Sequence, residues 1–297
     1  MTTGRPVGAV LTNPGADRVR AVRRLTGRSA RLREGRFVAE GPQAVTEAVD
    51  ATVAAVTAGA PPVVLELYTS SGAAARYPEV LEAARSVGVQ ARTATDQVLA
   101  AMSDTVTPQG LLAVCTLVDV PLAAVLDGRP GLVAVLGYVR DPGNAGTVVR
   151  AADAAGAGGV VLSDASVDVH NPKCVRASAG SIFHLPVATG VPLVPSLREL
   201  REAGLRVYAA DVSGDLDLDD LLDAVEDGEP GGLADPVAWV FGNEARGLPH
   251  EVLVACDGVV RVPVHGRAES LNLATAATVC LYASARASRR ARRPRQV

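Results

Sequence analysis

Apolar and polar positions alternate along this chain in patterns that predict strands and helices in turn. Short continuous apolar runs predict buried strands, and apolar residues recurring every three or four positions predict helices. In the first part of the chain, strands are expected at residues 36–39, 63–68, 89–93 and 111–117, with one or two helices at 17–32 and single helices at 42–50 and 79–87. This alternation predicts a small α/β domain.

The second part of the chain repeats this alternation with longer apolar runs. Strands are expected at residues 132–139, 159–162 and 205–211, with helices at 145–155 and 172–179. Asn144 is the expected N-cap of the first of these helices, and Gly156 is its expected stop. A strand, helix, strand unit predicts a parallel sheet, so an α/β fold is expected here as well.

Two later strands each run into a polar loop that contains glycine. Residues 237–241 are apolar and lead into Gly242, and residues 258–264 stop at His265 and Gly266. A helical pattern follows from Leu271. Ligands of parallel α/β proteins bind beyond the carboxyl ends of the strands, so these two loops are the predicted ligand site.

Shifts in composition divide the chain into segments. We expect a leader at residues 1–12, a first domain at 13–117, a linker at 118–131, a second domain at 132–286 and a basic tail at 287–297. The linker contains two prolines and two glycines, as is typical of domain boundaries. The acidic stretch DLDLDDLLDAVEDGEP, residues 215–230, predicts a solvated connector rather than a metal site.

Composition excludes several classes of protein. A chain of 297 residues with 48% hydrophobic content can form two cores. No apolar run is long enough to cross a membrane and no signal-peptide pattern is present, so a soluble cytoplasmic protein is expected. Cys115, Cys174, Cys256 and Cys280 form no close pair, which predicts buried free thiols, without disulfides or zinc.

Arginine supplies nearly all the positive charge of the chain. Lys173 is the only lysine, and arginine is the better residue for forked contacts with phosphate. The predicted phosphate contacts are Arg18, Arg24 and Arg36 in an early arginine cluster, with Lys173 and Arg176 on the 172–179 helix. GC-rich coding or solvated helix faces would produce the same enrichment, so both interpretations stay open at this stage. The early cluster consists of Arg18, Arg20, Arg23, Arg24, Arg28, Arg31, Arg33 and Arg36.

Several common catalytic motifs do not occur in the sequence. Gly156, Gly158 and Gly159 precede a strand rather than a helix, so they do not form a dinucleotide-binding loop. There is no phosphate-binding P-loop, no GxSxG nucleophile turn and no HExxH zinc helix. The four histidines lack metal-binding spacing and are expected to be loop or packing residues.

Three motifs follow one another in an order that points to one family. They are DPGNAGTVVR, VFGNEARGL and VRVPVHGRAESLNLATAA. Together they resemble the TrmH-type branch of the SPOUT family, which are RNA ribose 2'-O-methyltransferases that use S-adenosylmethionine. The resemblance covers residues 132–285. Ahead of it, RFVAEGPQAVTEAV and PQGLLAV are similar to a substrate-binding domain with a ribosomal L30e-like fold.

The resemblance has implications for shape, assembly and cofactor. It implies a trefoil-knotted catalytic domain, with the knot in residues 240–282, and a homodimer whose active site uses both subunits. It implies cofactor contacts at Gly242, Val262 and Leu271, with Val240 and Val264 as further candidates on the same loops. It implies no metal, because the leaving group is already a neutral thioether.

The resemblance also implies a catalytic set. Arg150 is placed at the ribose oxygen, and Asn144, Glu244, Ser270 and Asn272 complete the set. A charged arginine lacks an acceptor, so Arg150 is expected to stabilise the developing alkoxide, with general-base action as the second option. Capping and turn roles remain open for the two asparagines and the serine.

Ribosomal RNA, and 23S rRNA in particular, is the expected substrate, because the first domain is similar to the ribosome-associated type. Transfer RNA is the alternative. A non-catalytic RNA-binding or ribosome assembly protein of the same fold is a further alternative. Such a protein would be expected to have lost Arg150 or the region of Asn272, and both are intact.

Overall fold

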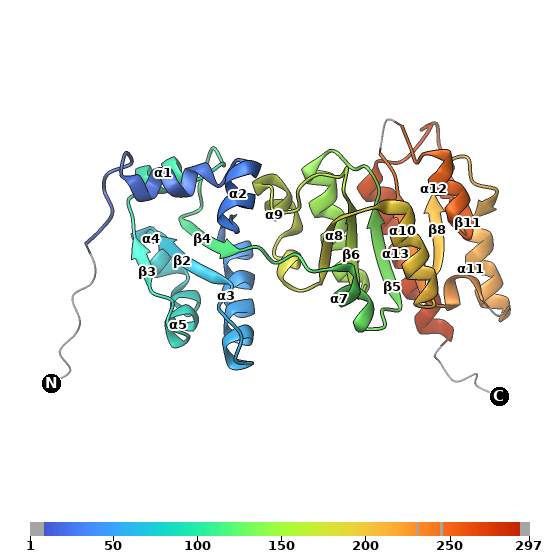
Figure 1. The fold of residues 1–297 in the computed structure, drawn as a ribbon, viewed down its shortest axis with the longest axis horizontal. Helices are drawn as coiled ribbons and strands as arrows, with labels where there is room; N and C mark the ends of the chain where they lie inside the picture. Colours follow the sequence, from blue (N-terminus) through green and yellow to red (C-terminus); the bar gives the residue numbers. More distant parts are fainter. Residues whose placement is uncertain (1–8, 230, 244–245, 292–297) are drawn as a thin grey trace. The chain divides into compact units, whose positions relative to one another are not determined.

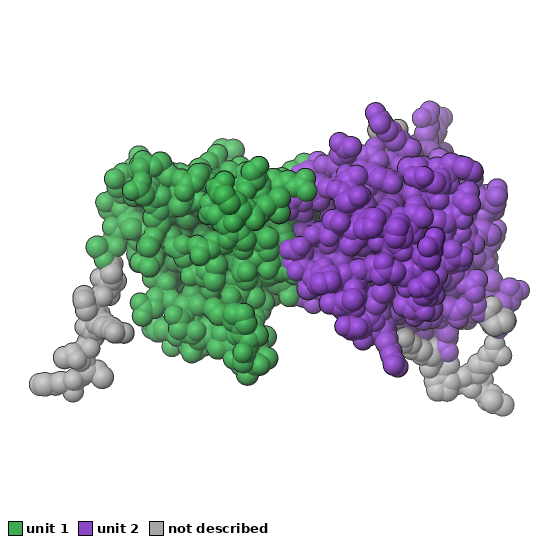
Figure 2. All heavy atoms as spheres, in the orientation of Figure 1, with its two compact units in different colours: residues 1–118, 170–183 green, residues 119–169, 184–297 purple. Residues whose placement is uncertain are grey.

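The computed structural model describes residues 9–229, 231–243 and 246–291. The chain forms two compact units (Figure 2). Unit 1 comprises the chain up to Val118 together with residues 170–183, and unit 2 comprises residues 119–169 and the chain from His184 onward. The segment 170–183 therefore interrupts the sequence of unit 2 but packs within unit 1.

Unit 1 is a four-stranded mixed sheet covered by helices (Figure 1). Its strand order is β1-β4-β2-β3, with β4 antiparallel to both of its neighbours and β3 parallel to β2. The predicted strands and helices of the first part are confirmed, and α4 and α6 are additional. The elements are α1 (Asp17–Arg24), α2 (Arg28–Glu34), β1 (Arg36–Glu40), α3 (Pro42–Thr57), β2 (Val64–Thr69), α4 (Ser71–Arg76), α5 (Pro78–Ser86), β3 (Ala91–Thr93), α6 (Asp96–Met102), β4 (Leu111–Thr116), α9 (Pro172–Ser178) and η1 (Ser181–Phe183).

The segment 170–183 packs against β1. The Phe37 ring lies 4.8 Å from the His170 ring and 6.0 Å from the Phe183 ring, measured between centroids. The His170 Nε2 atom accepts a hydrogen bond from the backbone N–H of Val118 at 3.2 Å. His170 is therefore a packing residue, as predicted. Within the described ranges, no group of three side chains is arranged to hold a metal ion.

Unit 2 is a seven-stranded sheet in the order β7-β6-β5-β10-β8-β11-β9, and every paired strand is parallel to its neighbour. This confirms the predicted α/β fold with a parallel sheet. The elements are α7 (Leu122–Asp127), β5 (Leu132–Leu136), α8 (Pro142–Ala155), β6 (Gly159–Ser163), β7 (Val187–Val191), α10 (Leu193–Glu202), β8 (Arg206–Ala210), β9 (Leu216–Asp217), α11 (Leu218–Asp227), η2 (Gly232–Ala234), β10 (Val237–Phe241), α12 (His250–Ala255), β11 (Gly258–Arg261) and α13 (Leu273–Ala291).

Strand β10 occupies the centre of this sheet, between β5 and β8. Both of its faces are covered, which explains why its sequence is continuously apolar. On one face, Val240 packs in a core to which α7, α10 and α12 contribute. On the other face, the Trp239 indole N–H donates to the Ser284 hydroxyl of α13 at 2.8 Å. The first turns of α8 and α13 meet on this second face.

The start of α8 differs from the prediction. Asp141, not Asn144, is the N-cap, since its carboxylate accepts a hydrogen bond from the Asn144 N–H at 2.8 Å. Pro142 follows at the first helical position, where a missing N–H costs nothing. The helix therefore begins three residues earlier than expected, and Asn144 lies inside its first turn. Gly156 ends the helix in the left-handed conformation, as predicted.

The acidic stretch was predicted to be a connector, and this is wrong for most of its length. It contains β9 and the helix α11, whose Leu218 and Val225 are buried. Most of its carboxylates are exposed, and two of them pair with arginines, Asp217 with Arg261 at 3.0 Å and Glu226 with Arg286. Leu218 and Val225 supply the buried face of the helix.

Three further segments differ from their expected character. Residues 1–8 of the expected leader lie outside the described residues, but Leu11 pairs with the chain beside β3, exchanging hydrogen bonds with Thr93 and Thr95. The expected linker at 118–131 contains α7, whose Val125 is fully buried in the core of unit 2. The expected basic tail begins within α13, which runs to Ala291. No helix among the described residues is long and apolar enough to cross a membrane.

Candidate functional site

A cavity of about 400 Å³ lies beyond the carboxyl ends of the strands of unit 2. We refer to it as the edge cavity. It lies where the ends of β8 and β10 meet the loop that follows β11 and the start of α13, which is the location predicted from the two glycine-bearing loops. Its lining residues are Ala210, Asp211, Val212, Phe241, Gly242, Asn243, Arg246, Gly247, Val262, Val264, Ser270, Leu271, Leu273 and Ala276.

Glycine is required at the first turn of this cavity. A Cβ atom on Gly242 would lie 2.7 Å from the carbonyl carbon of Gly247 and 2.8 Å from the Leu248 side chain. Asn243 and Gly247 close the turn by two backbone hydrogen bonds, of 3.2 and 2.8 Å. Gly247 has a φ of 61°, a conformation that favours glycine. The two backbone segments therefore approach each other closely and present peptide groups beside the cavity.

The rest of the lining is largely apolar. Val262, Val264 and Leu271 belong to the loop between β11 and α13, and Ala276 belongs to α13 itself. Asp211 and Arg246 are the charged side chains among the described lining residues. Apolar walls with a few polar groups of both charges suit a ligand that has a hydrophobic body and both positive and negative groups.

Asp211 is a lining residue that the sequence analysis missed. Its Oδ1 atom accepts hydrogen bonds from the Ser213 N–H at 3.0 Å and the Ser213 hydroxyl at 2.7 Å. Its Oδ2 atom lies 3.0 Å from where a Cβ on Gly247 would be. The available signal was its position directly after the apolar strand β8, since parallel strands end at the same edge.

The structure brings together four of the five predicted cofactor residues. Gly242, Val262, Val264 and Leu271 all line the edge cavity. Val240 does not, because its side chain is fully buried in the sheet core. Successive side chains of a strand point to opposite faces, so Val240 and its lining neighbour Phe241 cannot face the same way.

Two of the predicted catalytic residues contact each other. The Asn272 side-chain amide donates to the Asn144 side-chain oxygen at 3.3 Å. The Asn272 oxygen also accepts from the backbone N–H groups of Ala274 and Thr275, at 2.9 and 3.3 Å, and so caps α13. Asn272 therefore combines the capping role with a link to the first turn of α8. Ser270, two residues earlier, lines the edge cavity.

Arg150 lies apart from this group. It is exposed on α8, does not line the edge cavity, and has no ion pair or side-chain hydrogen bond with the rest of the described chain. Its guanidinium is therefore available to contact a group from outside this chain. Glu244, the remaining predicted catalytic residue, lies outside the described residues.

A second cavity of about 470 Å³ shares Asn243, Arg246 and Gly247 with the edge cavity and adds Tyr138 and Arg140. Tyr138 has a φ of 61°, which is uncommon for a residue with a side chain. Its carbonyl accepts from the Asn243 amide at 3.3 Å. Burial, with smaller effects of the Glu251 and Asp164 carboxylates, raises the pKa of the Tyr138 phenol. This cavity offers an aromatic ring and two guanidinium groups beside the edge cavity.

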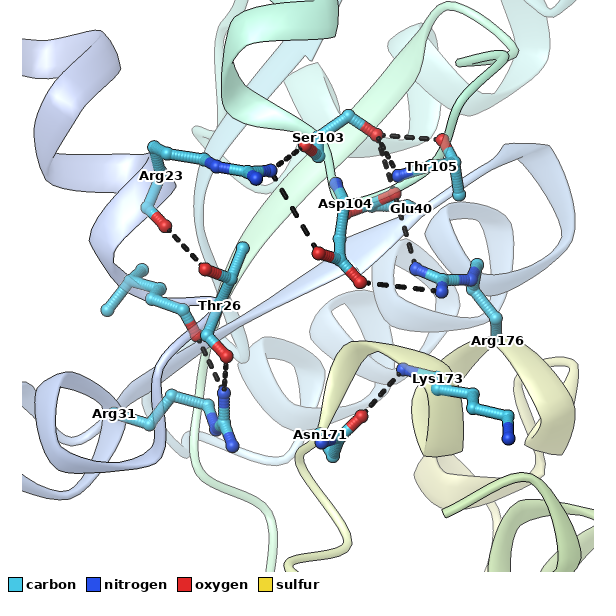
Figure 3. Close-up of polar contacts among 11 residues, drawn as sticks. Arg23, Thr26, Arg31, Glu40, Ser103, Asp104, Thr105, Asn171, Lys173 and Arg176 are labelled. Atoms are coloured by element: carbon cyan, nitrogen blue, oxygen red, sulfur yellow. Dashed lines mark hydrogen bonds and ion pairs between the residues drawn. The ribbon is translucent and has the colours of Figure 1, made fainter. Parts of the chain in front are cut away.

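The five predicted RNA-binding residues all belong to unit 1. Arg24 and Arg36 are exposed, and Arg18 lies 3.7 Å from the Glu66 carboxylate. Lys173 and Arg176 lie on α9 (Figure 3), where the Lys173 side chain extends away from the polar network that holds Arg176. All five therefore belong to one compact unit, although Arg18 and Arg176 lie beside carboxylates.

Arg31 of the early arginine cluster is an exception to the predicted phosphate-binding role. Its side chain is buried, and its Nη1 atom donates to the carbonyls of Leu25 and Thr26 at 2.9 and 2.7 Å (Figure 3). It therefore stabilises the turn between α1 and α2 and is not available to RNA. Sequence alone gave no means of separating it from its exposed neighbours.

Comparison with known families gives two matches that together cover most of the chain. Residues 131–282 match the SpoU rRNA Methylase family, and residues 16–113 match the MRM3-like substrate binding domain. The first match contains every lining residue of the edge cavity. The second contains β1, β2, β3 and the first three residues of β4.

Individual proteins show the same similarity. The 23S rRNA (guanosine(2553)-2'-O)-methyltransferase RlmP of Bacillus subtilis is 31% identical over 89% of this chain and 94% of its own length. An uncharacterized tRNA/rRNA methyltransferase of Mycobacterium ulcerans is 38% identical over 57% of this chain, which spans 51% of that relative. The crystal structure of an AdoMet-bound rRNA methyltransferase from Sinorhizobium meliloti superposes with a TM-score of 0.76 and 28% identity, over 94% of this chain and 97% of that one.

Proposed function

The chain belongs to the SpoU rRNA methylase family, and on that premise we propose that it methylates the ribose 2'-hydroxyl of ribosomal RNA with S-adenosylmethionine. The observation that carries the proposal is the edge cavity, which gathers Gly242, Val262, Val264 and Leu271 from separate segments of the chain. Four of the five expected cofactor residues thus line one cavity of about 400 Å³, within the range of about 300–1,000 Å³ that small-molecule sites occupy.

The lining suits S-adenosylmethionine chemically. The cofactor combines an adenine ring and a short aliphatic chain with a carboxylate, an ammonium group and a sulfonium. The apolar side chains of Val262, Val264 and Leu271 offer contacts to the ring, and the peptide groups around Gly242 offer hydrogen bonds. Asp211 and Arg246 supply one charge of each sign. When bound, S-adenosylmethionine supplies the methyl group for transfer to an oxygen nucleophile.

Arg150 acts on the acceptor oxygen. An arginine is charged at neutral pH and has no lone pair to accept a proton, so it stabilises negative charge as the ribose oxygen becomes an alkoxide. The hydrogen-bonded pair of Asn144 and Asn272 orients the acceptor ribose. Both roles depend on holding reacting atoms in place, which is a large part of the catalysis of group transfer.

A homodimer completes the site. Arg150 is exposed and has no partner in the described part of its own chain, so a second copy of this chain supplies the cavity beside which it acts. Symmetric dimers are the commonest assemblies of soluble enzymes, and one two-fold contact would create two such composite sites. The trefoil knot and a cytoplasmic location are further parts of this proposal, and both rest on the family resemblance.

Unit 1 binds the RNA substrate. It matches a substrate binding domain and carries the exposed cations Arg24 and Arg36. Ribosomal RNA is preferred to transfer RNA because the relative that aligns over nearly its whole length, RlmP, is a 23S rRNA methyltransferase. The mycobacterial relative carries the broader description of tRNA/rRNA methyltransferase, and therefore transfer RNA is the comparison substrate in the test.

Transfer of a labelled methyl group tests the proposal. The full chain is incubated with tritiated S-adenosylmethionine and, separately, with unmodified 23S rRNA, 16S rRNA and transfer RNA. We expect label in 23S rRNA and at most background in the other two. Label in transfer RNA alone would mean that transfer RNA, and not ribosomal RNA, is the substrate. No label in any RNA despite cofactor binding would favour a non-catalytic RNA-binding protein.

A further inference from the structure

Unit 1 contains a cavity that methyl transfer does not use. Its volume is about 130 Å³, and we refer to it as the Glu40 cavity. Both sequence motifs of the first domain line it, since Glu40 and Gly41 belong to RFVAEGPQAVTEAV and Gln109 and Gly110 belong to PQGLLAV. Antiparallel pairing of β1 with β4, which places Glu40 opposite Leu112, brings the two motifs together.

Glu40, Ser103 and Arg176 line this cavity and belong to one polar network, which is shown in Figure 3. The Glu40 side chain is 5% exposed. Its two oxygens accept hydrogen bonds from the Ser103 hydroxyl at 2.7 Å and the Asp104 N–H at 2.8 Å. Arg176 of α9 lies 3.6 Å from the Glu40 carboxylate and 3.6 Å from the Asp104 carboxylate. Each carboxylate oxygen of Glu40 can still accept a further hydrogen bond.

The Arg176 Nη1 atom is the observation that points to a ligand. It is buried and has no hydrogen-bond partner among the described residues, although it lies within ion-pair distance of Glu40. A buried donor without an acceptor is costly and uncommon in native proteins, so a partner from outside the chain is expected. The cavity therefore presents an unsatisfied donor, Arg176 Nη1, beside an acceptor with spare capacity, the Glu40 carboxylate.

Size and charge narrow the class of ligand. A volume of about 130 Å³ is well below the roughly 300 Å³ needed for a whole small molecule, so one group that projects from a larger molecule fits better. A phosphate is disfavoured, because the carboxylates of Glu40 and Asp104 already neutralise Arg176 and would repel an anion. Leu99 and Leu111 supply apolar walls suited to the faces of a planar ring.

We propose that the Glu40 cavity binds one RNA base whose edge has a carbonyl next to a ring N–H, which means guanine or uracil. Arg176 donates to the carbonyl and Glu40 accepts from the ring N–H. Adenine and cytosine present an amino group next to a bare ring nitrogen, so their edges place donor and acceptor in the reverse order. This inference rests on the proposed function for the choice of RNA as the ligand, and it assigns unit 1 a base-reading role in addition to phosphate binding.

Base analogues test the proposal on the unaltered chain. The probes are fluorescein-labelled adenosine decamers with one central guanosine, inosine, uridine or 2,6-diaminopurine, and binding is followed by fluorescence anisotropy at fixed salt. Guanosine, inosine and uridine keep the carbonyl beside the ring N–H, and 2,6-diaminopurine does not. An all-adenosine decamer serves as the reference probe. We expect the guanosine, inosine and uridine probes to bind roughly tenfold more tightly than the diaminopurine and all-adenosine probes, because one good base contact changes affinity by about that factor.

A matched pair of variants tests whether the base preference depends on Arg176. Arg176→Lys keeps the charge but loses the forked donor, and should abolish the preference for guanosine. Arg23→Lys changes a residue that contacts the Ser103 carbonyl in the same network but does not line the cavity, and should preserve the preference. Equal binding of all probes by the unaltered chain, or an unchanged preference in Arg176→Lys, would overturn the proposal. Absence of methyl transfer with the base preference intact would instead refute only the proposed enzymatic function.

Discussion

At the scale of single residues, close backbone approach limits what the edge cavity tolerates. Gly242 is not in the left-handed region, so its requirement for glycine comes from space and not from conformation. A Cβ atom at this position would lie nearest to the backbone of Gly247, which cannot move aside as a flexible side chain could. Gly266, on the next loop, has open space around the same position and offers a direct comparison.

Gly242→Ala is expected to lower the affinity for S-adenosylmethionine by roughly tenfold or more, equivalent to at least about 1.4 kcal/mol. The added methyl group would push apart the two segments that line the cavity. Isothermal titration calorimetry measures the effect, with Gly266→Ala as the matched control. Equal affinity in both variants would mean that the Gly242 turn does not contact the cofactor.

Arg150→Ala is expected to reduce kcat by roughly a hundredfold while cofactor affinity changes only a few-fold, as is typical when a group that stabilises transition-state charge is removed. Arg198→Ala removes an exposed arginine from α10 and serves as the control. Single-turnover methyl transfer and calorimetry separate the two quantities. A parallel fall in cofactor affinity would assign Arg150 a structural role.

At the scale of helices and strands, the first turn of α13 forms one wall of the edge cavity. Leu273 and Ala276 of this helix line the cavity, and Ser284 anchors its middle through the indole of Trp239. The indole N–H is fully buried, so the serine hydroxyl is its necessary acceptor.

Ser284→Ala would leave the Trp239 indole N–H without its acceptor. The free energy of unfolding should fall by about 1–3 kcal/mol, the usual cost of a buried unsatisfied donor. Ser288→Ala, one turn later on the same helix, should change it by less than about 0.5 kcal/mol. Trp239 is the only tryptophan, so its fluorescence during urea unfolding reports on unit 2. Equal stability of the two variants would contradict this role for the hydrogen bond.

The sequence predicted strands better than helices, and the reason is physical. Continuous apolar runs such as those in β5 and β10 are buried on both faces and are recognisable without knowledge of the fold. Short helices such as α7 and α12 have only six residues each, so their stability comes from packing that periodicity cannot show. The helix α11 was missed for a different reason, because its leucines stand among many carboxylates and the segment was interpreted as a solvated connector.

The loop residues of the candidate site could be predicted from the sequence motifs, but the contacts between segments distant in sequence could not. The motifs identified Gly242, Val262 and Leu271 because each lies within a conspicuous sequence block. Asp211 was missed although it directly follows an apolar strand, and the contacts of Arg176 with Glu40 and Asp104 join segments far apart in the chain, which spacing does not reveal. The contact of Asn144 with Asn272, 128 residues later, is of the same kind, since it follows only from the packing of α8 against α13.

At the scale of the whole molecule, the segment 170–183 limits how RNA binding by unit 1 can be tested, because truncation of unit 1 would disturb this segment. It lies between β6 and β7 of unit 2 in sequence but packs on the sheet of unit 1. A deletion of residues 1–115 would remove Phe37 and expose the buried side of α9, including Cys174 and Val175. Substitutions on the surface of unit 1 are therefore better tests of RNA binding than truncation.

The double variant with Arg24→Ala and Arg36→Ala is expected to weaken RNA binding and flatten its salt dependence. Each lost phosphate contact reduces the slope of log K against log salt by about 0.7–0.9, so a decrease of about 1.4–1.8 is expected for two contacts. Arg85→Ala, on α5 and paired with Glu82 at 3.0 Å, serves as the control. An unchanged slope in the double variant would exclude these arginines from the RNA surface.

The proposed product of this chain is ribosomal RNA that carries a methyl group on one ribose 2'-oxygen. The most direct measurement is mass spectrometry of nucleosides from unmodified 23S rRNA after incubation with the full chain and S-adenosylmethionine. We expect one 2'-O-methylated nucleoside, formed roughly a hundredfold more slowly when Arg150→Ala replaces the unaltered chain. A methyl group on a base, or no methylated nucleoside at all, would contradict the proposal.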